Sequence, residues 1–580
     1  MRRKYTLITS GGQKFDINKS FFLGQWCDEN LDTKHFINHH WNNKSKRFKD
    51  HEKLEKLYYK ILKILVKKLN EYHKKKENKI YWEIIIGPWL IFYLSAILDR
   101  WETLRIFFKK NNKVFFLPEI KLKKSSLIPK DTINFYKSVS SNKWNASVFF
   151  KMIKYQYNKN ILIKKKIDIK ENKKKSNKVN LPILKSFFYI INNFLCISAL
   201  KINKIILDDL FYSSKFTLIL NLKLFQIPSI LSTFFTLDES KEKISISKRL
   251  KIAPSGLKNK NLMNYILENI FLEIPKYYLE DFNYIEKKNF SINNLKKKLI
   301  VVNTSYAFNE RFKFWLAKMK KNGSKIFVTS HGGFLSTDVD GFLRFEKRIS
   351  DKYLTWNKQY QDKNGINLPP IQLEKYKNLK QIKRESCLII ASGVLKYARK
   401  LQSWPYSESF KIVQNFHIDL INNLNDQIKK KIIFRPLEDD GYFKITNNIK
   451  KRFKFLSISN SREISLRKEF ESAKIIVCSY PETPINDALF SNIPFVILYP
   501  ENLYSDFKKY KKILLPLKKN QILFNDPKKL SIHLNNIWND PGKWWLHKKT
   551  QDCIKKFKDE IIFDQNEPFN KWADYLSQFK

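Results

Sequence analysis

Hydrophobic and polar positions along the first hundred residues predict two strands followed by helices. Residues 4–10 and 20–26 are short β-rich runs bounded by polar residues or glycine, which indicates an α/β domain beginning at the N-terminus. Residues 51–73 carry apolar side chains at helical spacing and predict an amphipathic helix that faces the core. The most apolar run, 84–98, is bounded by charged residues and is too short to span a bilayer, so we expect a buried helix.

A repeated strand–helix pattern begins near residue 298. The runs "KLIVVNTS", "KIFVTSHGG" and "DKYLTWN" predict strands, and 307–321 predicts the helix that follows the first of them. After a polar segment at 360–384 with Pro369-Pro370, a second series has strands in "CLIIASG", "KKIIFRPL", "AKIIVCSY" and "PFVILYP", with helices at 407–428 and 483–491. This order implies parallel sheets that bind ligands at the carboxyl ends of their strands.

We therefore predict an α/β fold with two Rossmann-like units, as in the glycosyltransferase B (GT-B) architecture, and a helical extension in the N-terminal half. The expected divisions are an N-terminal domain at 1–384, a nucleotide-binding domain at 385–545 and a helical tail at 546–580. Residues 105–300 are less informative, and the lysine-rich run 163–178 is expected to be a solvated loop. The same architecture serves several transferases and an epimerase, so the fold alone does not choose a reaction.

Composition narrows the class of protein. The chain has 580 residues, 43% of them hydrophobic and 15% aromatic, which is typical of a folded protein with a large core. Its formal charge of +55 comes mostly from lysine spread along the chain together with abundant Asn and Ile. AT-rich codons supply that combination, and no helix-turn-helix, zinc-finger or RNP-like pattern appears, so no specific nucleic acid is expected. Weak peripheral contact with an anionic membrane stays an alternative.

The cysteines and the N-terminus bear on location. Five cysteines without CxxC spacing favour reduced thiols, and the basic first residues are not followed by an apolar signal-peptide core. We expect a cytoplasmic protein, with the inner face of the membrane as a possible peripheral location. No cofactor is expected. A metal is not expected either, because no clear DxD pair sits at a strand end.

The most informative site signal lies in residues 475–500. A predicted strand ends near Ser479, and Thr483 is expected to cap a helix whose first turn contains Pro484 and, one turn later, Asp487. Backbone N–H groups at such a helix start can bind a phosphate, and the carboxylate can bind ribose hydroxyls. The alternative is that Asp487 only complements the helix dipole.

Two further strand ends add candidates on this side. Arg435 follows a strand and is suited to clamp a phosphate, and Ser392 ends a strand beside Gly393, where small residues let a ligand approach. The acids at 438–440 are more typical of a solvated turn than of a metal site.

A histidine marks the first unit. His331, followed by Gly332 and Gly333, comes at the carboxyl end of a predicted strand and would face the same cleft. It is a candidate general acid or base, with a purely structural histidine as the alternative. Near the N-terminus, His39 and His40 would alternate sides in a strand, which disfavours a two-histidine metal site.

Ordered blocks resemble a known family. "FFLGQWC", "HHWNN", "YYKILKILVKKLNEYH", "YWEIIIGPWLIFYLSAILDRW", "GSKIFVTSHGG", "SDKYLTWN", "SNIPFVILYP" and "IWNDPGKWW" resemble, in order, a transferase family of bacterial surface-polysaccharide and flagellin-glycosylation loci, known by an LIC-series locus-tag name. The blocks cover most of the chain apart from about 105–295. The resemblance implies a GT-B-like C-terminal half and a role in surface-glycan or lipopolysaccharide assembly.

The family's blocks fall on particular residues of this chain. The resemblance implies catalytic roles for His40, Asp99 and His331. It implies substrate contacts for a second group: Trp41, Trp89, Arg100, Gly332 and Gly333. The sequence departs from the family at Ser330, where Gln is expected, and at Asp487, where Glu is expected.

Three functions stay open at this stage. The first is transfer of a sugar from a nucleotide donor, with a CMP-linked nonulosonate or keto-acid sugar as one candidate, to a glycan or protein acceptor. The second is polyol-phosphate transfer or nucleotide-sugar epimerisation on the same fold. The third is a non-catalytic basic protein that binds nucleic acid or membrane.

Overall fold

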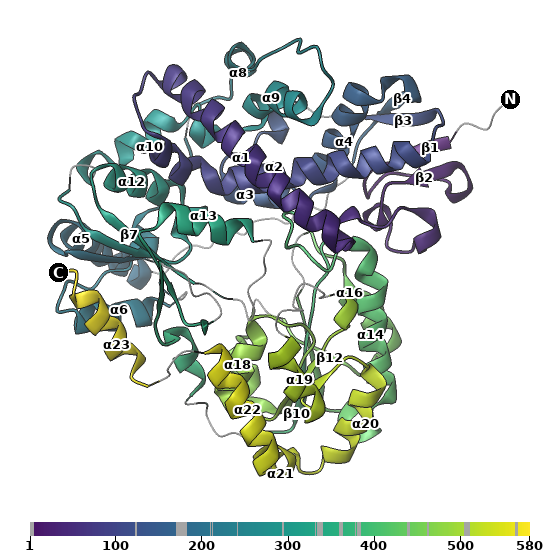
Figure 1. Cartoon of the computed structure of the whole chain (residues 1–580), viewed down its shortest axis with the longest axis vertical. Coiled ribbons are helices and arrows are strands. Elements are labelled where there is room, and N and C mark those ends of the chain that lie inside the picture. The colour runs from purple at the N-terminus through teal and green to yellow at the C-terminus, as the bar shows by residue number, and fades with distance from the viewer. Residues whose placement is uncertain are drawn as a thin grey trace.

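A computed structural model provides the structure of the chain (Figure 1). It describes residues 5–580 except 122–123, 170–182, 209, 211–212, 241, 293–294, 331, 333–339, 359–363, 378, 380–383, 438–440, 461–462, 504–510 and 563–565. The described chain contains three sheets, and all pairs between their strands are parallel. The predicted α/β class is therefore confirmed.

The sheet nearest the C-terminus has the Rossmann strand order. Its strands are β10 (Ser386–Ala391), β11 (Ile432–Pro436), β12 (Ser457–Ile458), β13 (Ala473–Cys478), β14 (Phe495–Leu498) and β15 (Leu523–Phe524). They lie in the order β12-β11-β10-β13-β14-β15, so the direction of winding reverses between β10 and β13. Ligands of such sheets bind beside the carboxyl ends of the two strands at the reversal.

The second sheet runs in sequence order and belongs to the N-terminal half. It consists of β5 (Ile205–Asp208), β6 (Leu299–Val302), β7 (Lys325–Thr329), β8 (Lys352–Thr355) and β9 (Gly365–Asn367). These two sheets, each covered by helices, give the two Rossmann-like units predicted from the sequence. The segment after β9 is more than a link, because η11 (Ile371–Tyr376) packs against a helix of the C-terminal unit.

A third sheet was not predicted as such. It joins β2 (Ser20–Phe22), β1 (Tyr5–Ile8), β3 (Phe115–Ile120) and β4 (Ile161–Ile167) in that order. The first two strands confirm the prediction for the N-terminus. The prediction of a loop across 163–178 is wrong for its first part, which belongs to β4, and the part from residue 170 on lies outside the described residues.

Helices fill the space between and around the sheets. In the N-terminal half these are α1 (Lys44–His73), α2 (Lys79–Lys110), α3 (Thr132–Ser138), α4 (Asn142–Gln156), α5 (Ile183–Ile202), α6 (Ser214–Lys223), α7 (Leu231–Phe234), α8 (Ile246–Ile252), α9 (Leu262–Glu273), α10 (Phe282–Lys288), α11 (Ser305–Phe308), α12 (Glu310–Lys321) and α13 (Gly341–Ile349). The C-terminal unit carries α14 (Phe410–Asn423), α15 (Asp426–Lys429), α16 (Ile445–Arg452), α17 (Leu466–Ser472), α18 (Thr483–Ser491), α19 (Lys511–Lys519), α20 (Pro527–Ile537), α21 (Pro541–Leu546) and α22 (Lys548–Ile561).

The last helix, α23 (Pro568–Ser577), returns to the N-terminal half. It packs beside α6, and the Trp572 indole donates to the Pro369 carbonyl over 2.8 Å. Figure 1 shows α23 next to α6, across the molecule from α20. The chain therefore passes between the two units twice, first through η11 and again just before α23.

The longest helix, α2, forms the centre of the largest hydrophobic core. In its apolar window 89% of the residues are buried inside the protein, and α1 and α12 pack against it. By length and composition α2 is the one helix among the described residues that is apolar enough to cross a membrane. The predicted buried helix is thus confirmed, although it is longer than the run 84–98.

Candidate functional site

A cavity of about 1150 Å³ lies between the two Rossmann-like units. Its N-terminal wall includes Gly332 after β7, and its C-terminal wall includes Thr483 at the start of α18. A Cβ atom added to Gly332 would lie 3.3 Å from Thr483 Oγ1, so the two walls meet here. Gly332 and Thr483 were both predicted as site residues, and the structure brings them together at the carboxyl ends of the strands.

Three acidic side chains that line the cavity have pKa values raised to near 7. Burial raises the pKa of Glu346, on α13, to about 8, although a hydrogen bond from the Tyr306 hydroxyl opposes the shift. Burial raises the pKa of Glu482 to about 7, with Lys400 acting in the opposite direction. Burial raises the pKa of Asp487 to about 6. Carboxyls with pKa values this near 7 are suited to general acid or base chemistry.

Asp487 lies on the cavity wall where the sequence predicted it. It is 7% exposed, and Lys375 and a hydrogen bond from Tyr376 oppose the effect of burial on its pKa. Both of these residues belong to η11, the segment between the units. Together with Thr483 they form a polar wall beside the start of α18.

The helix α18 spans the predicted residues 483–491 but has a different capping residue. Its N-cap is Glu482, and Thr483 is the first helical residue, so the prediction that Thr483 caps the helix is wrong by one position. Pro484 lies in the first turn as predicted, because a proline there lacks only an N–H that has no partner within the helix. The Glu482 side chain makes no capping hydrogen bond and lines the cavity instead.

The N-terminal wall is built around α13. Asp340 caps this helix by accepting from the N–H groups of Phe342 and Leu343, and it also accepts from Gln402 over 2.6 Å. Gly87 of α2 allows α13 to approach closely, because a Cβ atom there would lie 2.4 Å from the Phe345 ring. The glycine-proline-tryptophan block therefore positions the helix that carries Glu346.

Ser392 and Ser479, the predicted residues at the strand reversal, lie close together, but only Ser392 lines a cavity. The N–H of Ser392 donates to Ser479 Oγ over 3.1 Å, which ties the ends of β10 and β13. Ser392 lines a smaller cavity of about 170 Å³ that shares Glu482 and Lys400 with the large one. Ser479 is buried and contacts His417 Nε2 over 2.9 Å.

Gly393 has a structural reason to be glycine. A Cβ atom there would lie 2.2 Å from the Leu437 carbonyl oxygen, so the backbone after β11 requires the space. This accounts for the small residue that the sequence analysis had connected with a ligand.

Arg435 makes a network of its own at the end of β11. Its guanidinium lies 2.5 Å from Glu469 and donates to Ser459 Oγ and to the Ile464 carbonyl. It is not among the residues that line the large cavity, whereas Arg467 of α17 is. The predicted phosphate clamp therefore has a carboxylate partner already.

Asp99 and Arg100 lie at a buried junction on α2. Arg100 is fully buried, contacts Asp99 Oδ2 over 2.7 Å and donates to Asn145 Oδ1 and to the Ala398 carbonyl. These bonds join α2 to α4 and to the segment leading from β10. Burial alone would raise the pKa of Asp99, but its interactions with His39 and Arg100 lower it well below the usual value.

The two adjacent histidines converge on Asp99. Asp99 Oδ1 lies 2.8 Å from His39 Nε2 and 3.0 Å from His40 Nε2, and the two rings stack with centroids 4.7 Å apart. The prediction that they point to opposite sides of a strand is wrong, because His40 begins the 3₁₀ helix η4 (His40–Asn42). Both rings and the carboxylate are buried.

This histidine–aspartate cluster has the residue types of a metal site. One ligand atom from each of His39, His40 and Asp99 lies within 4.8 Å of the others. Two hydrogen bonds also hold this arrangement: His39 Nδ1 accepts from the Trp41 N–H, and His40 Nε2 pairs with Asp99 Oδ1 over 3.0 Å. A metal at this position would compete with the Arg100 charge for the same carboxylate.

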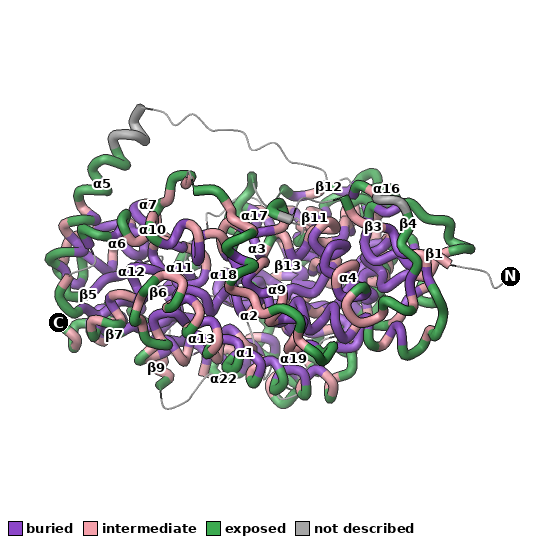
Figure 2. Tube along the Cα trace, turned by 90° about the horizontal axis from the view of Figure 1, so that it is seen from above, coloured by how far each residue is buried: buried purple, intermediate pink, exposed green. Residues whose placement is uncertain are grey.

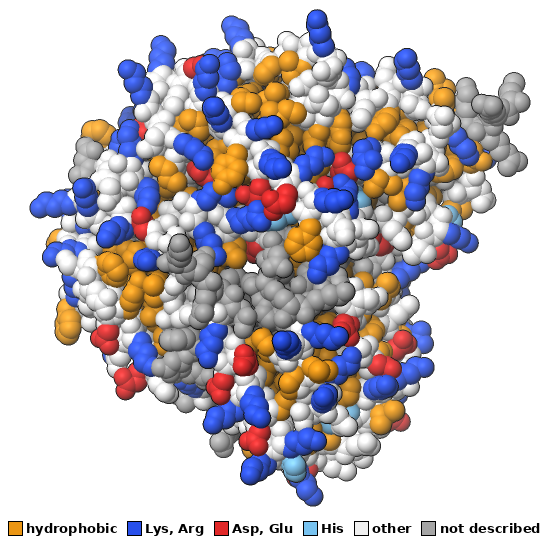
Figure 3. All heavy atoms as spheres, viewed as in Figure 1, with side chains coloured by type: hydrophobic (Ala, Val, Ile, Leu, Met, Phe, Trp, Pro, Cys, Tyr) orange, Lys and Arg blue, Asp and Glu red, His pale blue; other side chains and the backbone are white. Residues whose placement is uncertain are grey.

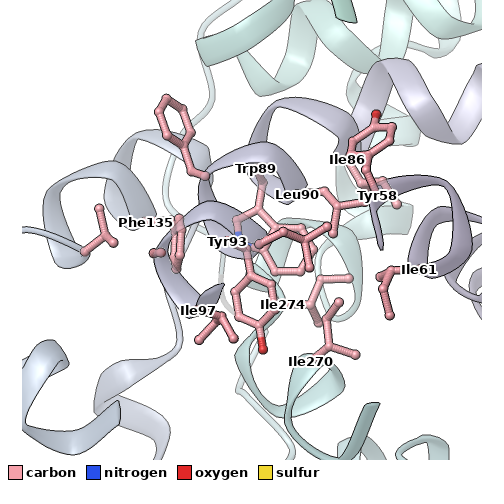
Figure 4. Close-up of a cluster of buried hydrophobic side chains, with 14 of the residues drawn as sticks. Tyr58, Ile61, Ile86, Trp89, Leu90, Tyr93, Ile97, Phe135, Ile270 and Ile274 are labelled. Carbon is pink, nitrogen blue, oxygen red and sulfur yellow. The ribbon is translucent and has the colours of Figure 1, made fainter. Parts of the chain in front are cut away.

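Five of the predicted site residues therefore lie away from the cavity. His40, Trp41, Trp89, Asp99 and Arg100 are buried, and none is among the residues that line it. Figure 4 shows Trp89 within the α2 core beside Tyr93 and Phe135. The catalytic roles predicted for His40 and Asp99 and the substrate contacts predicted for the other three stay predictions. The contacts observed in the structure position helices. His331 and Gly333 lie outside the described residues.

Several cavity residues were missed by the sequence analysis. They are Tyr306, Glu346, Lys375, Lys400, Arg467 and Glu482. Glu482 had a signal, because it directly precedes the predicted helix at the end of a strand. Glu346 had none, because it reads as one of the polar positions of an amphipathic helix.

Comparison with solved structures finds only weak likenesses. The wall teichoic acid polymerase TagF aligns with 12% identity and a TM-score of 0.28, over 51% of this chain and 83% of its own. Trehalose-6-phosphate synthase OtsA aligns with 10% identity and a TM-score of 0.31, over 54% and 79%. MurG of Acinetobacter baumannii aligns with 9% identity and a TM-score of 0.28, over 52% and 80%. The fold assignment depends on the sheets described above.

Sequence similarity is more decisive. None of the curated proteins compared is similar enough to match the chain. A family described as LIC12162 family transferase matches residues 5–576, which is nearly the whole length. The chain therefore belongs to the LIC12162 family of transferases.

Proposed function

We propose that this transferase moves a sugar from a nucleotide-activated donor to a hydroxyl group of a glycan or protein acceptor. The observation that carries the proposal is the cavity between the two sheets, which is lined by Glu482, a carboxyl with a pKa of about 7. A donor at the strand reversal of the C-terminal sheet and an acceptor on the opposite wall would both reach this carboxylate.

The C-terminal wall offers groups suited to the nucleotide. Lys375 and Arg467 line the cavity and supply positive charge for phosphates, and the start of α18 supplies backbone N–H groups. Asp487 is placed one turn into α18, where its carboxyl can accept from ribose hydroxyls. Because the wall contains several cations, a CMP-linked acidic sugar is the donor to test first.

The N-terminal wall suits a sugar acceptor. Half of the residues that line it are aromatic: Phe92, Tyr136, Phe216, Tyr306, Phe308, Phe342, Tyr353 and Trp356. Aromatic faces pack against the apolar faces of sugar rings, while the Tyr306 and Tyr353 hydroxyls provide polar contacts. This division gives each Rossmann-like unit one substrate.

The transfer step follows from these positions. The acceptor oxygen forms a bond to the anomeric carbon of the donor while the bond from that carbon to the phosphate oxygen breaks. Glu482, ionised above about pH 7, takes the proton from the acceptor hydroxyl, and Lys375 with Arg467 stabilises the charge left on the departing phosphate.

The test combines binding and turnover. Thermal unfolding is measured with CMP, CDP, UDP and GDP, because a ligand at a hundred times its dissociation constant adds about 2.7 kcal/mol of stability. Transfer is then assayed with sugars linked to the nucleotide that binds. Glu482→Gln should keep the nucleotide shift and lose about 10²–10⁴-fold in turnover.

Glu374→Gln is the matched control, since Glu374 lines the same cavity and pairs with Lys377 over 2.7 Å. It should retain turnover. Equal turnover in Glu482→Gln and the wild type would refute the assignment of the base. Absence of any nucleotide shift would refute a nucleotide donor, and products from a polyol-phosphate donor or epimerised sugars would replace glycosyl transfer with those reactions.

A further inference from the structure

Among the described side chains of α5, the buried ones that attach the helix to the protein are Asn192, Cys196, Ala199 and Leu200. Asn192 is 4% exposed and donates to the Ile230 carbonyl and to Thr233 Oγ1, while Cys196 and Ala199 are buried. The side chains of α5 are described from Phe188 onward. A surface helix ordinarily buries its apolar face and exposes its polar one.

The opposite face of α5 is apolar and open to solvent. Ile190 is 67% exposed, Phe194 70% and Ile197 40%, and their spacing places them on one side of the helix. Figure 2 shows α5 as an exposed helix that stands out from one end of the molecule. Packing in the core does not account for these three large apolar side chains, because the core contacts the other side of the helix.

A second exposed apolar group lies at the C-terminal end of α5. Ile202 is 69% exposed, and Phe225 is 94% exposed. The Asn203 side chain bonds to the backbone of Ile227 in both directions, which holds the segment containing Phe225 beside the end of the helix. The two groups together form what we call the α5 surface: Ile190, Phe194, Ile197, Ile202 and Phe225.

Phe225 has a conformation that is costly for its residue type. Its φ is +47°, in the left-handed region that bulky side chains rarely adopt. The chain there holds an aromatic ring almost entirely in water instead of folding it inward. Such a residue is suited to insert into a partner.

The charge around the α5 surface selects the kind of partner. Lys201, Lys204 and Lys223 are exposed, and residues 183–227 contain five lysines against two aspartates. Lysine and arginine side chains are also scattered over the face of the molecule drawn in Figure 3. A second copy of this chain would bring the same positive charge, whereas an anionic bilayer is complementary to it.

We propose that the α5 surface docks this transferase on an anionic phospholipid bilayer. Ile190, Phe194 and Phe225 enter the boundary between headgroups and acyl chains, and the lysines contact the lipid phosphates. Apolar burial and lysine attraction add in such binding, so both are needed for stable attachment. The cavity lies elsewhere on the molecule, so docking and nucleotide binding are separable.

The test is flotation of the full-length protein with vesicles of phosphatidylcholine, alone or with about one third phosphatidylglycerol. Binding is expected only with the anionic vesicles and should fall as salt rises. Phe194→Ser combined with Phe225→Asn should reduce binding by about tenfold or more. Asparagine tolerates positive φ, so this change at Phe225 should not harm folding. Lys201→Glu combined with Lys204→Glu should reduce it similarly.

Two controls match these changes elsewhere. Ile532→Ser removes a 60% exposed apolar side chain from α20, and Lys528→Glu with Lys529→Glu reverses the same number of charges on that helix. Both should bind like the wild type, and every variant should show the wild-type nucleotide shift. Equal loss in the controls, binding to neutral vesicles alone, or conversion of a dimer to a monomer by the α5 variants without vesicle binding would overturn the proposal.

Discussion

Gly332 and Thr483 lie next to each other where the two walls of the large cavity meet, and a Cβ atom on Gly332 would lie only 3.3 Å from Thr483 Oγ1. One residue follows a strand of the N-terminal unit and the other begins a helix of the C-terminal unit. Because they are so close, the size of the side chain at position 332 controls how far apart the two walls of the cavity lie at this point.

Gly332→Leu should therefore block the cavity. We expect nucleotide affinity or turnover to fall by about tenfold or more, because the added side chain occupies the space between the walls. Isothermal titration with the best nucleotide checks this. Gly341→Ala is the control, since a Cβ atom there would meet its nearest neighbour, an Ile91 methyl group, at 3.9 Å. Unchanged binding and turnover in Gly332→Leu would show that no substrate passes this point.

Removing Arg100 should destabilise the protein, since it leaves Asp99 charged and buried. Loss of one partner of a buried pair costs about 3–5 kcal/mol. The urea midpoint of Arg100→Ala checks this. Arg344→Ala is the comparison, because the ion pair of Arg344 with Glu52 is exposed to solvent and such a pair is expected to contribute at most about 1 kcal/mol. Wild-type stability together with lost turnover in Arg100→Ala would instead favour the substrate contact implied by the family resemblance.

The sequence predicted the strands that are continuous apolar runs and missed those that are not. Runs such as "IIVC" and "FVIL" stand between polar turns and appear as β13 and β14. In contrast, β3 contains Pro118, which argues against a strand, and β4 is an edge strand rich in lysine. Local sequence patterns therefore could not show that residues 105–300 contribute strands to a sheet.

Site residues that follow a strand could be predicted from the sequence. Those that reach the site through contacts between distant parts of the chain could not. Thr483 and Asp487 come directly after β13, so their position at the cavity followed from topology. Glu346 reaches the cavity because its neighbour Phe345 packs on Gly87, more than 250 positions earlier in the chain. Arg100 owes its burial to Asn145 and Ala398, which no local pattern connects to it.

Glu346 should make stability depend on pH. Its folded-state pKa of about 8 lies above the ordinary 4.5, so the folded state holds a proton that the unfolded chain releases between these values. Stability should therefore fall as pH rises from about 4.5 to 8, by about 1.4 kcal/mol for each unit of pKa difference. Glu346→Gln removes this slope and should be more stable than the wild type at pH 8.

Melting temperatures of the wild type and Glu346→Gln between pH 5 and about pH 9 test this sign. The melting temperature of Glu374→Gln, a change in the same cavity, should depend on pH in the same way as that of the wild type. A difference between Glu346→Gln and the wild type that stays constant with pH would mean that Glu346 does not titrate in this range.

The sequence predicts that Arg435 binds the nucleotide phosphate, whereas the structure favours Arg467 for this role. Arg435 is held by Glu469, Ser459 and a backbone carbonyl, so Arg435→Ala should lower stability and leave nucleotide affinity nearly unchanged. Arg467 lines the cavity, and Arg467→Ala should weaken nucleotide binding by about 10–100-fold, the effect of losing a hydrogen bond to a charged group. Titration calorimetry and thermal unfolding of both variants distinguish the two roles. If Arg435→Ala weakens binding while Arg467→Ala does not, the phosphate lies at the end of β11, and Arg435 must exchange Glu469 for the nucleotide when the donor binds.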